Sequence, residues 1–216
     1  MTTFHRLMIL SIALVTSGYS STCAGAEPIY RQDFSKSEEG KVPDDMLVLD
    51  GGFAVRKAAG ETALELPGAP LETFGVLFGP SEKDGIRVSA RIHATAKGRR
   101  FPVIGTGLNG AVPYRLQITP AKKALELFKG DDLLTSVAFS WVSDSWTVLR
   151  LQLKALPAGG WRLEGRAWKQ GDAEPAGWTV SHDLKEEPVP GRASIWGKPF
   201  SETPIRFDDL VVEKAP

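Results

Sequence analysis

Arginine recurs at the polar positions of segments in which apolar and polar residues alternate. Such alternation occupies residues 86–94, 114–118, 149–153 and 161–168, and arginine takes six of the polar positions while lysine takes none. A guanidinium group binds carboxylates and hydroxyls through a planar fork of donors, whereas a lysine ammonium behaves as a flexible point charge. If these strands share one sheet, they predict a glycan-binding groove, suited to an acidic glycan, formed by Arg91, His93, Arg115, Arg150, Arg166 and the indole of Trp168.

The same positions allow a second interpretation, in which the arginines only stabilise the outer surface of a sheet. Opposite charges on neighbouring strands pair across a sheet. The aliphatic stems of arginine also cover apolar surface. The two interpretations differ in which strands are neighbours, and periodicity alone does not decide this.

The elements that position these side chains are strands almost throughout. A period of two predicts half-buried β-strands, and Gly- and Asp-rich turns separate the segments, for example at residues 50–52, 83–85 and 129–132. The segments Tyr114–Ile118 and Leu125–Phe128 predict a hairpin. Beyond residue 26 there is no sustained helical period. The pattern therefore predicts an all-β fold of two antiparallel sheets packed face to face as a jelly-roll sandwich.

The first 26 residues have the pattern of a signal peptide. Arg6 precedes an apolar run at residues 7–15, and Ala24-Gly25-Ala26 matches the site that a signal peptidase cleaves. The run is too short to span a bilayer, which takes about 20 apolar residues. We therefore expect an exported protein, periplasmic or extracellular, in which residues 27–216 form one domain without a membrane span. Lipidation of Cys23 is the alternative, although the preceding residues lack the usual aliphatic residue three places upstream.

Charge and composition narrow the class of partner. The chain has 26 basic and 26 acidic residues, so loss of Arg6 with the leader gives 25 − 26 = −1. A surface with so little positive charge does not indicate binding to nucleic acid. Cys23 is the only cysteine, so the mature chain would contain neither a disulfide nor a cysteine-based zinc site. Oligomeric state is not evident from the sequence.

Several short motifs occur in an order that resembles a known superfamily. They are Asp33-Phe34, Gly40-Lys41-Val42-Pro43, Gly51-Gly52-Phe53-Ala54-Val55, Trp146–Leu151, Gly191–Lys198 and Phe207–Val212. Together they resemble the concanavalin A-like lectin/glucanase jelly rolls, and are most similar to exported bacterial domains described as 3-keto-disaccharide hydrolase-like or of unknown function. The resemblance covers residues 29–213. It implies a concanavalin A-like sandwich, but this fold carries binding modules as well as enzymes.

The resemblance also directs attention to catalytic carboxylates and to calcium. Glucanases of this superfamily carry Glu-x-Asp-x-x-Glu on one strand, and this chain has no complete run of that kind. In jelly rolls the last strand often pairs beside the first. That pairing would bring Asp33 near Asp208 and Asp209, and carboxylates brought together favour a hard cation. These three residues are therefore the predicted ligands of a structural calcium ion, with solvent exposure or arginine pairing as the alternative.

Three functions remain open from the sequence. The leading prediction is a non-catalytic glycan-binding or structural module of a polysaccharide-handling system. An enzyme that hydrolyses or eliminates (keto-)glycosides is the alternative, with His93, Arg115, Glu164 and His182 as its acid/base candidates. A protein-interaction domain that uses the same sheet face is the third. Clustering of the acid/base candidates in one cleft would favour the enzyme, whereas a fully ion-paired surface would favour the interaction domain.

Overall fold

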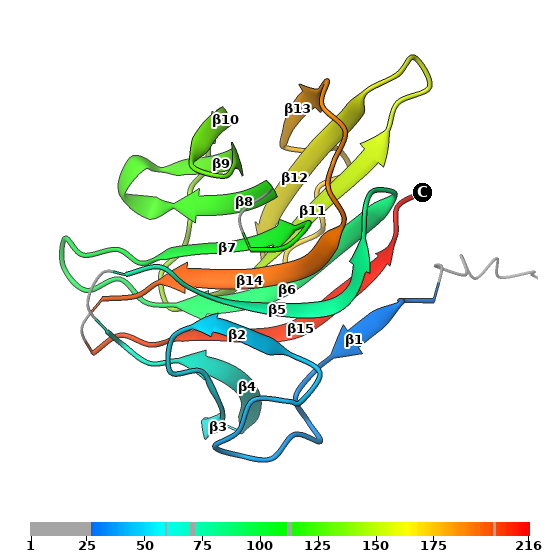
Figure 1. Ribbon diagram of the computed structural model, residues 1–216. Coiled ribbons are helices and arrows are strands. Elements are labelled where there is room, and N and C mark those ends of the chain that lie inside the picture. The colour runs from blue at the N-terminus through cyan, green and yellow to red at the C-terminus, as the bar shows by residue number, and fades with distance from the viewer. Residues whose placement is uncertain (1–26, 59, 70–71, 112–113, 201) are drawn as a thin grey trace, which may run out of the picture.

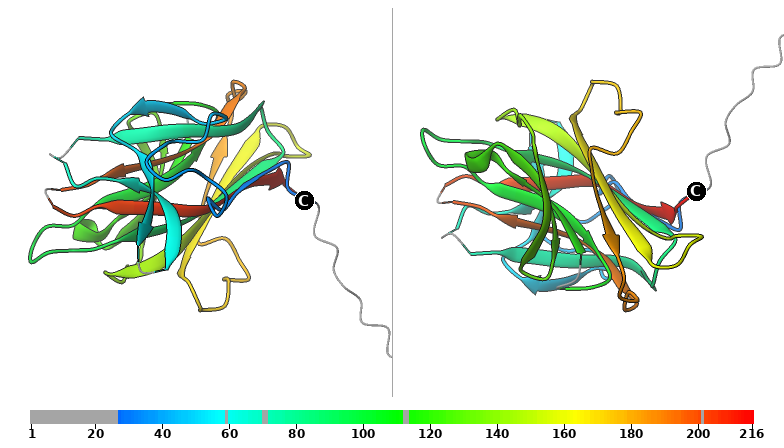
Figure 2. Two further views of the ribbon diagram at one scale, coloured as in Figure 1. Left: turned by 90° about the horizontal axis from the view of Figure 1, so that it is seen from below. Right: turned by 90° about the horizontal axis from the view of Figure 1, so that it is seen from above.

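The structure of this protein is a computed structural model, and it describes residues 27–216 except residues 59, 70–71, 112–113 and 201. The predicted signal peptide and Cys23 lie outside the described residues. The two predicted sheets are present as two layers of antiparallel strands, which confirms the all-β sandwich (Figures 1 and 2). No helix among the described residues is long and apolar enough to cross a membrane.

Sheet A contains eight strands, in which seven follow the order β13-β12-β11-β6-β15-β4-β3 and β1 pairs with β15 beside them. Its members are β1 (Tyr30–Gln32), β3 (Ala54–Ala58), β4 (Glu61–Leu66), β6 (Ile86–Ala94), β11 (Ser145–Ala155), β12 (Trp161–Lys169), β13 (Val180–Leu184) and β15 (Ile205–Lys214). The register of β1 on β15 sets Gln32 opposite Leu210. The first and last strands are therefore neighbours, as predicted.

Sheet B contains seven strands in the order β10-β9-β8-β7-β14-β5-β2. Its members are β2 (Leu47–Asp50), β5 (Phe74–Glu82), β7 (Val103–Leu108), β8 (Tyr114–Thr119), β9 (Ala124–Lys129), β10 (Asp132–Ala138) and β14 (Gly191–Lys198). The predicted hairpin is the pair β8–β9, joined by a 3₁₀ turn over Pro120–Lys122. Lys123 closes that turn with a φ of 53°, in the left-handed region.

One hydrophobic core fills the space between the sheets. On β6 the inward residues are fully buried at Val88, Ala90 and Ile92, and the polar residues between them face outward. The core runs from Phe34 near β1 to Val212 on the last strand. The described strands thus pack around one core, and the two outer sheet faces and the loop ends remain for function.

Candidate functional site

Five of the six residues predicted to bind a glycan share the outer face of sheet A. Arg91 and Trp168 both lie opposite Val148, from β6 and β12 respectively. Two residues beyond Val148 on β11, Arg150 lies opposite Arg166. Two residues before Val148, Trp146 lies opposite His93. The sixth residue, Arg115, is on β8 in sheet B, so the six do not form one surface.

The arginines of this face are held by acidic side chains of the same protein. Arg91 forms ion pairs with Asp208, with Asp209 at 3.1 Å and with Glu61 at 3.5 Å. The connection between β12 and β13, drawn gold in Figure 2, supplies Glu174, which lies 2.6 Å from Arg150.

Arg166 is held by the same connection. It pairs with Glu174 and donates a 2.7 Å hydrogen bond to the carbonyl of Pro175. A network of this kind is what the interaction-domain alternative predicts.

The four acid/base candidates are not brought together. Glu164 and His182 lie on adjacent strands but face opposite sides, because Leu163 and not Glu164 is the register partner of His182. Within the described residues, no hydrogen bond or ion pair joins any two of the four. Arg115 is in the other sheet, and His93 lies 3.4 Å from Asp144. Burial lowers the pKa of the His93 imidazole, and the charge of Asp144 opposes that shift.

The three predicted calcium ligands do not assemble into a metal-binding group. The Oδ1 of Asp33 accepts hydrogen bonds from the amide of Ser35 at 3.1 Å and from its hydroxyl at 2.6 Å. Asp208 and Asp209 both form ion pairs with Arg91, which already neutralises them. Among the described residues there is no group of three histidine, cysteine, aspartate or glutamate side chains that could hold an ion. The residues present therefore do not fit the predicted calcium site.

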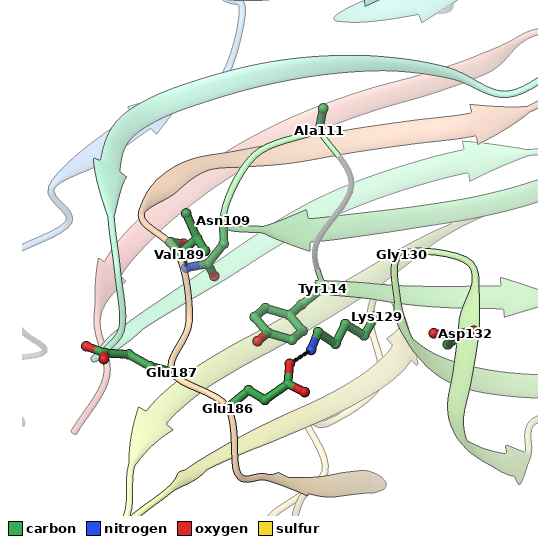
Figure 3. A pocket seen from close by; sticks show the side chains of 9 residues that line it. All are labelled: Asn109, Ala111, Tyr114, Lys129, Gly130, Asp132, Glu186, Glu187 and Val189. Carbon is green, nitrogen blue, oxygen red and sulfur yellow. Dashed lines mark hydrogen bonds and ion pairs between the residues drawn. The ribbon is translucent and has the colours of Figure 1, made fainter.

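A cavity of about 570 Å³ lies at one end of the sandwich, and we call it the end cavity. It lies where β7 ends, β8 begins and β9 turns into β10, and the connection between β13 and β14 runs along one side of it (Figure 3). Its lining residues are Asn109, Ala111, Tyr114, Lys129, Gly130, Asp132, Glu186, Glu187 and Val189.

Asn109 joins the β13–β14 connection to the end of β7. Its φ of 67° turns the chain at the end of β7. Its side-chain amide donates to the carbonyls of Lys83 at 2.6 Å and Val189 at 2.8 Å. Gly191 makes the close approach possible, because a Cβ there would overlap the backbone of Asn109. One asparagine and one glycine thus hold the β13–β14 connection against the end of β7.

Two polar groups in the end cavity lack hydrogen-bond partners within the described residues. The Oδ1 of Asn109 is buried and unpaired, and the residue is only 6% exposed. The hydroxyl of Tyr114 also makes no hydrogen bond there, and burial raises its pKa. Figure 3 shows the Tyr114 ring between Asn109 and the ion pair of Lys129 with Glu186. An unpaired buried acceptor is costly unless a ligand or water satisfies it.

A second, smaller hollow of about 120 Å³ lies on the outer face of sheet B, and we call it the Trp196 hollow. Both register partners of Trp196 are glycines, Gly75 on β5 and Gly105 on β7. A Cβ at Gly105 would lie 2.8 Å from the indole, so a larger residue there would displace it. The residues that line the hollow are Leu49, Asp50, Thr73, Phe74, Gly75, Ala111, Arg115, Ser194, Ile195 and Trp196.

The Arg115 side chain extends over this hollow, and its positive charge is little balanced by acidic groups among the described residues. Its guanidinium carbon lies 4.6 Å from the centre of the Trp196 ring and 5.1 Å from that of Phe128. Its ion pair within the described residues is with Asp131, which is fully exposed and 3.7 Å away. Burial lowers the pKa of Arg115, with Asp131 acting in the opposite sense.

Sequence reasoning identified Arg115 but missed the end cavity. The lining residues come from three separate turns, and none of them forms a recognisable motif. The Asn109-Gly110 dipeptide is typical of a turn, and that is all it indicates. Only the tertiary structure, which brings the end of β7 against the β13–β14 connection, shows that the Asn109 side chain binds this connection.

Comparison with known proteins supports the fold. No protein-family model and no curated protein matches this chain. Among solved structures, the carbohydrate binding module CBM66 from Bacillus subtilis is similar, with a TM-score of 0.56 and 9% identity over 79% of this chain and 96% of that one. The VIP36 exoplasmic/lumenal domain in its Ca²⁺/Man2-bound form gives a TM-score of 0.57 and 9% identity over 82% and 85% of the two chains.

An enzyme is similar to the same degree. The marine PL-14 alginate lyase from Aplysia kurodai gives a TM-score of 0.62 and 10% identity over 88% of this chain and 100% of that one. At such identities the likeness shows the fold alone, a sandwich of two antiparallel β-sheets. Membership of the concanavalin A-like superfamily stays a prediction. Assignment to the 3-keto-disaccharide hydrolase-like group stays a prediction.

Proposed function

We propose that this protein is a glycan-binding module and that the end cavity is its binding site. The observation that carries the proposal is the buried Oδ1 of Asn109, which has no hydrogen-bond partner within the described residues. Asn109 and Tyr114 both line the larger of the two cavities described above. The similar carbohydrate-binding structures support the class of ligand but do not identify the site.

Sugar hydroxyls suit this arrangement because each one both donates and accepts a hydrogen bond. A hydroxyl can donate to Asn109 Oδ1 and another can exchange a hydrogen bond with Tyr114. The ion pair between Lys129 and Glu186 offers a donor and an acceptor on the opposite side of the ring. The cavity volume lies within the range of about 300–1,000 Å³ that is usual for small-molecule sites.

A glycan-array screen of residues 27–216 tests the proposal, with Tyr114→Phe and Glu186→Gln as the variants. Tyr114→Phe removes a hydroxyl and keeps the ring, so the fold is retained. One lost hydrogen bond corresponds to a decrease in affinity of about threefold to tenfold. Tyr30→Phe is the matched control, because it makes the same change at a tyrosine on β1, outside the cavity.

Each outcome decides a separate point. Binding that Tyr114→Phe and Glu186→Gln weaken, and Tyr30→Phe leaves unchanged, supports the end cavity. Binding that none of these variants changes would overturn the placement. Absence of binding to any glycan would overturn the function itself and return attention to turnover of keto-glycosides.

The outer face of sheet A stays the competing site, and Trp168→Ala tests it in the same screen. The indole of Trp168 lies under Arg150, at 5.5 Å from the guanidinium carbon. Because Arg150 and Arg91 already have acidic partners there, we expect Trp168→Ala to leave glycan binding unchanged. Binding abolished by this variant alone would place the site on the arginine face of sheet A.

We further propose that the protein is exported and begins at Glu27 after cleavage. The support is the leader-like pattern of residues 1–26 and a sandwich whose core begins at Phe34. N-terminal sequencing of protein recovered from outside the cytoplasm tests this. A start at Glu27 is expected, whereas a lipid-modified Cys23 at the start would establish the lipoprotein alternative.

A further inference from the structure

We infer that the Trp196 hollow is an anion subsite, which binds a carboxylate or sulfate group carried by the ligand. The inference rests on the proposed function for the glycan part of the ligand, but the anion contact can be tested without it. It is distinct from the end cavity, although Ala111 lines both.

The first step is the charge balance around Arg115. Its side chain is 21% exposed, and its partner Asp131 is fully exposed at 3.7 Å. Solvent strongly screens an ion pair at that distance when one partner is fully exposed. In sheet A, by contrast, Arg91 is neutralised by the buried Asp208. Arg115 thus carries a partly buried positive charge for which the described residues offer no buried counter-ion.

The second step is the set of unpaired donors beside it. The Nε of Arg115 and the indole Nε1 of Trp196 are buried and have no hydrogen-bond partner in the part of the chain that the structure describes. Trp196 is 6% exposed and lines the hollow. Both groups are donors only. Because each unmade hydrogen bond has a cost, a ligand that supplies acceptors gains affinity here.

The third step is the shape of the hollow. The strands beside Trp196 have glycines, Gly75 and Gly105, and Gly107 lies beside Ser194. Because glycine has no side chain, the sheet surface is depressed at these positions. The volume of about 120 Å³ is below the usual range for a whole small-molecule site, so it suits one substituent group. Asp50 at the β2 side already accepts a 2.7 Å hydrogen bond from Gly51. The remaining lining groups at Arg115, Trp196 and Ser194 offer donors, which an anion requires.

Calorimetric titration of residues 27–216 at low salt tests the inference with glucuronate, inorganic sulfate and the neutral sugar glucose. The two anions distinguish a carboxylate from a sulfate subsite. Arg115→Gln should weaken anion binding about tenfold to a hundredfold, as expected for loss of a charge-assisted hydrogen bond. Added NaCl should weaken it as well. Arg150→Gln is the matched control and should change nothing, because Arg150 is held by Glu174.

Trp196→Phe is the second variant, since it removes the indole N–H and keeps an aromatic ring; its folding is checked by circular dichroism. Anions and glucose bound equally, or anion binding that survives Arg115→Gln, would overturn the inference. Glycan binding that persists without preference for acidic glycans would overturn it while the proposed function stands. Anion binding through Arg115 without any glycan binding would support the subsite and overturn the glycan-binding function.

Discussion

Tyr114 and Arg115 are consecutive residues of β8, and they point to opposite sides of sheet B. Tyr114 packs inward into the end cavity, whereas Arg115 extends outward over Trp196. The alternation of a strand thus places one residue in each of the two proposed subsites. A variant at either position therefore tests one subsite without altering the other.

Gly191→Ala should displace the β13–β14 connection from the end cavity. A Cβ at this position would overlap the backbone of Asn109, which cannot move without losing its hydrogen bonds to the β13–β14 connection. We expect a loss of about 1–3 kcal/mol in the free energy of unfolding, typical of steric overpacking, together with weaker glycan binding. Urea denaturation measures the first effect. Gly177→Ala is the control, since a Cβ there has no neighbour within 4 Å; equal stability of both variants would contradict the prediction.

Glu174→Gln should destabilise the arginine network of sheet A. One carboxylate serves both Arg150 and Arg166, so its removal leaves two partly buried guanidinium groups close together without their shared counter-ion. The expected loss in unfolding free energy is about 1–3 kcal/mol, measured by urea denaturation. For comparison, Glu38→Gln removes an ion pair in which both side chains are 68% exposed and should cost less than about 0.5 kcal/mol. A Glu174 variant as stable as the Glu38 variant would refute the shared role.

His93 should make stability fall as the solution becomes acidic. Burial lowers the pKa of His93 from its ordinary value of 6.5, so the folded state binds this proton less readily than the unfolded state. The contribution is fully present above pH 6.5 and is lost as pH falls through the lower folded value. Thermal unfolding from pH 7.5 to 5 should show a steeper decrease for the wild type than for His93→Gln. Identical pH profiles would show that His93 titrates normally in the fold.

Calcium should not stabilise the sandwich. Arg91 already neutralises Asp208 and Asp209, and Asp33 is held by its own turn. An ion present at one hundred times its dissociation constant would add about 2.7 kcal/mol of stability. We expect the same melting temperature in EDTA and in millimolar CaCl₂. A higher melting temperature in calcium that Asp209→Asn abolishes would restore the predicted site.

The strand pattern predicted the sandwich well where burial is one-sided. Residues 86–94 alternate over nine positions, and the structure forms β6 with its apolar residues inward. The edge strand β10 was not predicted, because its exposed Leu133 breaks the contrast between faces. An edge strand pairs with a neighbour along one edge only and is less buried. Its residues therefore carry a weaker periodic signal.

The sequence by itself determined the fold class, and it determined which side chains of each long strand face outward, because alternation is a local property of the chain. Only the tertiary structure decided which strands share a sheet. It separated Arg115 from the other predicted residues, supplied Glu174 to two arginines and gave Asp208 to Arg91 instead of to a cation. It also formed the end cavity from turns that are far apart in the chain. These contacts join residues as much as 117 positions apart, and no local period carries information about such a pairing.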